Sequence, residues 1–212
     1  MSLPFPFSLY VISDRSLLGG WDPLLAALER ALAGGADAVQ LREKDLSAKE
    51  LQPRAREVRE LTRRFGVRLI INDRIDVAQA VDADGVHLGG HSLPARAVRE
   101  RVGGALLIGV STHSVGEVAA AAAAGADFVT FGPVYATASK AAYGLPVGVP
   151  ALAEACRAAP VPVYALGGVT LERRQAVLAA GAAGCAVISA VLAAPDPAQA
   201  AAGFIRGVGL DI

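Results

Sequence analysis

The ten residues GADAVQLREK, at positions 35–44, hold the three features that decide the fold. The opening Gly-Ala-Asp suits the end of a helix, because glycine accepts the left-handed backbone of a helix cap. The apolar run behind it is continuous, which is typical of a strand buried on both faces. The stretch then ends on Gln40, Arg42 and Lys44, polar side chains that a buried core disfavours. It therefore predicts a helix end, a buried strand and a polar strand terminus, in that order.

The same turn recurs at residues 82–86, 125–129 and 181–185. Its four copies precede the second, fourth, sixth and eighth of the short apolar runs. These runs cover residues 8–13, 38–42, 68–72, 85–88, 106–111, 128–132, 163–166 and 185–189. A turn that repeats at every second strand predicts a closed ring of βα units. We therefore expect one α/β domain over residues 1–212, a single (β/α)₈ TIM barrel. An open doubly wound sheet is the alternative, although no Gly-x-Gly-x-x-Gly follows the first run.

Composition limits the classes of partner. The 212 residues are 53% apolar, and 20 basic residues balance 20 acidic ones. Nucleic-acid and membrane-surface binding need a basic excess, so we expect neither partner. Cys156 and Cys185 match no metal spacing, and no leader peptide or spanning segment is apparent. The expectation is a cytoplasmic protein with a small phosphorylated substrate, and the sequence is compatible with a homo-oligomer.

Polar or glycine residues end nearly every apolar run, and in a barrel these ends meet at the face that carries the chemistry. Gln40, Arg42 and Lys44 alternate, so their side chains point to the same side of the strand. Two cations in this arrangement predict a clamp on a phosphate or diphosphate. A solvated strand end is the alternative.

A second anion site is predicted after the last two strands. Gly167 and Gly168 precede a helix, where backbone N–H groups favour bound anions. Ile188 and Ser189 supply the other half, in the loops that usually bind phosphate in barrels. An ordinary tight turn is the alternative for the glycine pair.

Three further strand ends carry candidate site residues. Asn72 and Asp73 either hold Mg²⁺ or cap the next helix. His113 lies before a helix N-terminus, which favours the neutral ring and predicts a general acid/base; Ser111 beside it is a candidate substrate contact.

The loop after the sixth strand is long for a βα connection, and its residues 137–144 are a candidate lid. Lys140 in this lid would bring a positive charge over the site. His87, within its strand, is expected to be an interior residue.

Six segments, in order from about residue 9 to residue 191, resemble the thiamine phosphate synthase and thiazole tautomerase superfamily. They are QLREK at 40–44, NDR at 72–74, GVHLG at 85–89, STH at 111–113, GPV at 132–134 with TASK at 137–140, and ALGG at 165–168. The resemblance implies a (β/α)₈ barrel. Its synthase branch joins a pyrimidine methyl diphosphate to a thiazole phosphate and releases diphosphate with Mg²⁺. Its tautomerase branch aromatises a carboxythiazole phosphate without a metal.

The resemblance also implies roles for single residues. In the synthase branch the pyrimidine diphosphate and phosphate contacts match Gln40, Arg42, Lys44, Asn72, Lys140, Gly168, Ile188 and Ser189. Asp73 matches a metal ligand of that branch. In the tautomerase branch the histidine that matches His113 moves the proton.

One departure from the synthase pattern favours the tautomerase branch over the synthase branch. The synthase usually has His-Leu-Gly-Gln-x-Asp after the fourth strand, and its aspartate is the second metal ligand. Here residues 87–92 read HLGGHS, so Ser92 stands in place of that aspartate. A neutral hydroxyl is a poor replacement for a carboxylate beside a hard dication. The lid departs too, because Ala141 follows Lys140 where the synthase commonly has a second lysine.

The main prediction is therefore a thiazole tautomerase, an isomerase that uses His113 as its acid/base and needs no cofactor. Thiamine phosphate synthase, a transferase with Mg²⁺ on Asp73, is the alternative, because the residues that match its diphosphate contacts are intact. A non-catalytic barrel that binds a phosphorylated ligand is the lesser alternative.

Overall fold

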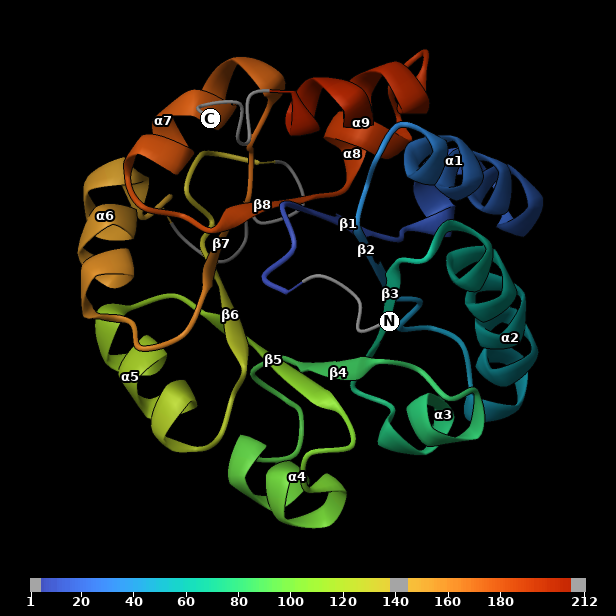
Figure 1. Ribbon diagram of the computed structural model, residues 1–212, viewed down its shortest axis with the longest axis horizontal. Coiled ribbons are helices and arrows are strands. Elements are labelled where there is room, and N and C mark those ends of the chain that lie inside the picture. Colours follow the sequence, from blue (N-terminus) through green and yellow to red (C-terminus); the bar gives the residue numbers. More distant parts are fainter. Residues whose placement is uncertain (1–4, 138–144, 207–212) are drawn as a thin grey trace.

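The computed structural model describes residues 5–137 and 145–206, and its eight strands close into a parallel barrel in chain order, β1 to β8. Figure 1 shows the helices as a ring around these strands. The strands are β1 (Leu9–Ile12), β2 (Ala38–Leu41), β3 (Arg68–Asn72), β4 (Gly85–Leu88), β5 (Leu107–Thr112), β6 (Phe128–Phe131), β7 (Val163–Leu166) and β8 (Gly184–Val187). The predicted α/β class and single (β/α)₈ barrel are confirmed.

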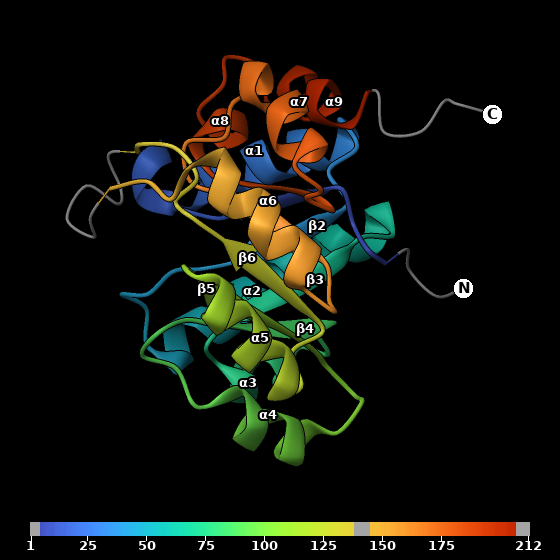
Figure 2. The same cartoon turned by 90° about the vertical axis from the view of Figure 1, so that its left-hand side faces the viewer.

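Helices follow each strand, and a short 3-10 turn, η1 (Arg15–Leu18), precedes the first of them. They are α1 (Trp21–Ala33), α2 (Ala48–Phe65), α3 (Ile75–Ala80), α4 (Ala95–Val102), α5 (Val115–Ala123), α6 (Gly148–Ala158), α7 (Leu171–Ala179), α8 (Ser189–Leu192) and α9 (Pro197–Ile205). From the side, α4, α5 and α6 follow one another along the outside of the strands (Figure 2). None of the helices in the described part of the chain is both long and apolar enough to cross a membrane.

Three of the four copies of the repeated turn carry an aspartate that binds the start of the preceding strand. Asp37 accepts hydrogen bonds from the backbone N–H groups of Ser8 (2.7 Å) and Leu9 (2.8 Å) at the start of β1. Asp84 does the same for Leu69 of β3, and Asp127 does it for Ile108 of β5, each at 2.7 Å. Each aspartate therefore precedes an even-numbered strand and satisfies the first N–H groups of the odd-numbered strand before it.

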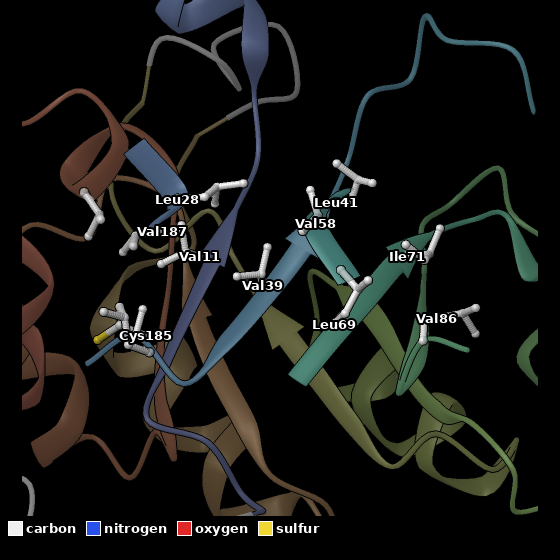
Figure 3. Close-up of a cluster of buried hydrophobic side chains, with 14 of the residues drawn as sticks. Val11, Leu28, Val39, Leu41, Val58, Leu69, Ile71, Val86, Cys185 and Val187 are labelled. Atoms are coloured by element: carbon white, nitrogen blue, oxygen red, sulfur yellow. The ribbon is translucent and has the colours of Figure 1, made fainter. Parts of the chain in front are cut away.

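Two apolar layers make the core. The outer layer lies between strands and helices and includes Val39, Leu69 and Val58 of α2, which are labelled in Figure 3. The inner layer fills the barrel and is closed at its N-terminal end by Phe7, whose ring stacks on Tyr164 with centroids 4.3 Å apart. The barrel is thus filled by side chains, and its C-terminal mouth carries the polar side chains that the sequence singled out.

Candidate active site

Three predicted residues lie near the C-terminal ends of strands β2, β3 and β5. Gln40 is opposite Ile12 of β1 and Ile70 of β3, Asn72 is opposite His87, and Ser111 is opposite Thr130. Gln40 is almost fully buried, and its amide Nε2 donates to the hydroxyl of Tyr10 at 2.9 Å. The structure therefore brings these polar side chains to one end of the barrel.

The predicted cationic clamp lies mostly on a loop. Strand β2 ends at Leu41, so Arg42 and Lys44 belong to the β2–α2 connection, where Arg42 is half-buried and Lys44 is exposed. Both line a hollow of about 440 Å³ at the barrel rim, together with residues of the β1–α1 connection. Arg15, Asp14, Glu43 and Asp45 line it too, and Arg15 pairs with Glu43 and Asp45. Among the described residues this leaves Arg42 and Lys44 as the cations of the hollow that suit an anionic ligand.

Glu43, which the sequence argument left without a role, holds this loop in place. Its buried carboxylate accepts from the hydroxyl of Ser13 (2.6 Å) and from the backbone N–H and guanidinium of Arg15 (3.2 and 3.1 Å). Ser13 Oγ in turn accepts from the backbone N–H of Arg42 at 2.8 Å. Arg15 also pairs with Asp45, and this contact lowers the pKa of the Asp45 carboxyl. The one signal of this role in the sequence was the position of Glu43, a carboxylate between the cations Arg42 and Lys44.

Asp73 is tied to the loop after β4. Its backbone is left-handed, with φ at 60°, and its carboxylate accepts from Asn72 Nδ2 at 2.8 Å. The hydroxyl of Ser92 donates to the other carboxylate oxygen of Asp73, and Ser92 Oγ accepts from the backbone N–H of Gly89 at 2.6 Å. Helix α3 receives no side-chain cap from any described residue, so the helix-cap alternative for Asn72 and Asp73 is wrong.

His113 lies directly after β5 and is exposed. Its ring Nδ1 contacts the carbonyl oxygen of Gly132, which can only accept, so Nδ1 carries a hydrogen; in the neutral ring Nε2 is then the acceptor. Its backbone N–H donates to the carboxylate of Glu117 at 2.7 Å. The ring is therefore anchored to the β6 end with an acceptor nitrogen exposed.

Gly167 and Gly168 are both left-handed, with φ at 93° and 63°. A Cβ on Gly168 would lie 2.7 Å from the carbonyl oxygen of Ala136, and the backbone N–H of Tyr135 donates to Gly167 at 3.0 Å. The two glycines thus pack against Tyr135 and Ala136, at the start of the β6–α6 loop. Within the described residues the N–H of Gly168 donates to no acceptor, which leaves it available to an anion.

The β8 end completes this side of the mouth. Ile188 precedes α8 and Ser189 begins it, and α8 has no side-chain cap among the described residues. Lys140 and most of the candidate lid, residues 138–144, lie outside the described residues.

The comparisons with known proteins agree with this geometry. A family model described as thiamine monophosphate synthase matches residues 9–191. A Geobacter sulfurreducens protein, provisionally named thiamine-phosphate synthase, is 58% identical over 195 residues, which cover 92% of this chain and 91% of that protein. The thiamine-phosphate synthase of Roseiflexus castenholzii is 45% identical over 201 residues, which cover 93% of this chain and 88% of that protein. The solved structure of a thiamine phosphate pyrophosphorylase from Pyrococcus furiosus superposes with a TM-score of 0.86, at 36% identity and 94% coverage of both chains.

These findings correct the main prediction from the sequence. Thiazole tautomerase, an isomerase, is wrong, because the relatives and the structural neighbour carry the names of the transferase branch. The error came from Ser92. Magnesium sites commonly use one or two carboxylates completed by substrate phosphates and water, so a single serine replacement is not a reason to reject the synthase branch. Asp73 keeps its carboxylate, with Ser92 bound to it, beside an intact set of polar and cationic groups. The chain belongs to the thiamine monophosphate synthase family.

Proposed function

We propose that the protein is a thiamine phosphate synthase, a transferase that joins a pyrimidine methyl diphosphate to a thiazole phosphate and releases diphosphate. The observation that carries the proposal is that two separate groups of candidate anion contacts lie at one barrel mouth. Arg42 and Lys44 follow β2, whereas Gly168, whose N–H has no acceptor within residues 5–137 and 145–206, and the start of α8 follow β7 and β8. A reaction between two phosphorylated substrates needs two such groups of contacts.

The region after β2 and β3 suits the diphosphate. In the reaction the bond between the methylene carbon and the diphosphate oxygen breaks, and the thiazole nitrogen forms a bond to that carbon. The electron pair of the broken bond leaves with the diphosphate, whose negative charge grows. Arg42 and Lys44 would bind this leaving group, with Gln40 and Asn72 as neutral contacts. Glu43 and Ser13 keep Arg42 in place before the substrate arrives.

The region after β7 and β8 suits the thiazole phosphate. Its backbone N–H groups would bind the phosphate, with Gly167, Gly168, Ile188 and Ser189 as the proposed contacts. The guanidinium of Arg173, which donates to the carbonyl oxygen of Gly168 at 2.7 Å, lies at the same turn. Lys140 is proposed as a further cation of this region. His113 and Ser111 are proposed as polar contacts of the heterocycles, because C–N bond formation at the methylene carbon removes no proton from carbon.

Asp73, Asn72 and Ser92 fit a magnesium ion through oxygen atoms only, which is the ligand type that Mg²⁺ prefers. Asp73 would hold the ion, and the diphosphate and water would complete its coordination. Among the described residues no group of three His, Cys, Asp or Glu side chains gathers. A bound Mg²⁺ would supply neutralisation of the diphosphate charge.

An assay with both substrates tests the proposal. We expect thiamine phosphate to form only when the pyrimidine diphosphate and the thiazole phosphate are both present. EDTA should abolish the turnover and excess Mg²⁺ should restore it. Binding of both ligands without product, in the presence of Mg²⁺, would overturn the proposal and favour a non-catalytic barrel.

A further inference from the structure

A chain of hydrogen bonds crosses the barrel interior, and its two central residues have no role in the proposed function so far. Gln40 Nε2 donates to the hydroxyl of Tyr10 at 2.9 Å, and that hydroxyl lies 3.4 Å from Nδ1 of His87. His87 Nε2 lies 3.0 Å from Oγ of Ser111. The chain therefore starts at one proposed substrate contact, Gln40 on β2, and ends at another, Ser111 on β5.

The interior is built around this chain. Tyr10 is fully buried and His87 is 3% exposed, so water does not compete for their polar atoms. Gly109 of β5 makes room for the imidazole, since a Cβ there would lie 2.6 Å from Nδ1 of His87. The ring of Phe128 lies beside it, with centroids 5.8 Å apart. This packing holds the imidazole in one orientation.

The direction of the first two bonds follows from the amide. The NH₂ group of Gln40 can only donate, so the oxygen of Tyr10 accepts from it. Burial raises the pKa of Tyr10 well above its ordinary value, so the phenol keeps its single hydrogen. That hydrogen is directed to Nδ1 of His87, the other partner of the hydroxyl.

The direction of the last bond follows from the imidazole. Because Nδ1 accepts from Tyr10, the hydrogen of the ring is on Nε2 and is donated to Ser111 Oγ. Ser111 is half-buried and has no other hydrogen-bond partner within the described residues, so its own hydrogen is available to a ligand.

We propose that Tyr10 and His87 are positioning residues that fix the hydrogen-bonding direction of Gln40 and Ser111 toward the substrate. Gln40 then presents its amide oxygen as an acceptor, and Ser111 presents its hydroxyl as a donor. Such a pair selects a nitrogen heterocycle that offers one donor and one acceptor. The assignment of that heterocycle to the pyrimidine substrate rests on the proposed function, but the direction of the chain does not.

The tautomer of His87 tests the direction without any turnover. The full-length protein, labelled with ¹⁵N-histidine, has three histidines, and His87→Gln identifies the signals of His87. Long-range ¹H–¹⁵N spectra near neutral pH should show hydrogen on Nε2 and a bare Nδ1. Hydrogen on Nδ1, or on both nitrogens, would overturn the proposal, whatever the enzyme activity proves to be.

Matched variants test the positioning role. His87→Gln keeps a donor near the place of Nε2, whereas His87→Asn places its amide near Nδ1. We expect the KM for the pyrimidine diphosphate to rise about fivefold or more in His87→Asn and in Tyr10→Phe, and less in His87→Gln. The KM for the thiazole phosphate should stay unchanged. Equal KM values in the Gln and Asn variants would contradict the role of His87, and the wild-type tautomer decides the direction even if Tyr10→Phe fails to fold.

Discussion

Arg42 is the side chain on which the proposed diphosphate site depends most. Its backbone N–H donates to Ser13 Oγ, which fixes the main chain from which the guanidinium extends. Arg42→Ala should raise the KM for the pyrimidine diphosphate by about 10- to 100-fold, because a charged hydrogen bond contributes roughly 1.5–3 kcal/mol. Arg157→Ala, which removes an exposed arginine from α6, is the control in steady-state kinetics. The same KM in both variants would contradict the assignment of Arg42.

His87 makes the stability of the fold depend on pH. Burial lowers its pKa in the folded state to about 4, from an ordinary value of 6.5. As the pH falls from about 6.5 to about 4, His87 binds a proton in the unfolded chain but not in the folded chain. The free energy of unfolding therefore decreases over this range. The full loss is about 3 kcal/mol. Urea unfolding at several pH values should show this slope in the wild type and lack it in His87→Gln; equal slopes would show that His87 is not the cause.

The turn between β7 and α7 shapes the second anion region through two left-handed glycines. Gly168→Ala should strain the backbone and displace the loop start at Ala136, which a Cβ would approach to 2.7 Å. Gly66→Ala is a matched control, since Gly66 has a φ of 64° but nothing within 4 Å of the added Cβ. We expect a loss of roughly 1–2 kcal/mol of unfolding free energy for Gly66→Ala and a larger loss for Gly168→Ala.

The KM for the thiazole phosphate distinguishes a loss of phosphate binding at Gly168 from backbone strain alone. Gly168→Ala should also raise the KM for the thiazole phosphate by about tenfold, whereas Gly66→Ala, at the end of α2, should leave it unchanged. Thermal or urea unfolding and steady-state kinetics measure the two effects. If Gly168→Ala and Gly66→Ala have the same KM for the thiazole phosphate, Gly168 is not part of the proposed phosphate site.

Elements were predictable from the sequence where the signal is local. Apolar runs and glycine caps predicted the strands, because burial on both faces and left-handed caps are properties of short segments. The aspartates of the repeated turn were visible, but their bonds to the preceding strand join residues up to 29 positions apart. The same separation hid Glu43, whose partner Ser13 lies 30 positions away. No local pattern reports such partners.

The architecture of the whole molecule followed from the repeat, and the choice of reaction did not. Ser92 was read as the loss of a metal ligand, although its hydroxyl is bound to the carboxylate that remains, Asp73. A metal site completed by its substrate cannot be judged from protein ligands alone. The barrel brings two anion regions to one mouth, and this arrangement, together with the family, is what favours a joining reaction.

The central claim is that this barrel joins its two substrates, and ³¹P NMR of one reaction mixture tests it most directly. With the pyrimidine diphosphate, the thiazole phosphate and Mg²⁺ present, the account predicts that free diphosphate and thiamine phosphate appear in equal amounts. Both should depend on the enzyme. Substrate signals that broaden on binding, while no diphosphate appears, would contradict the account.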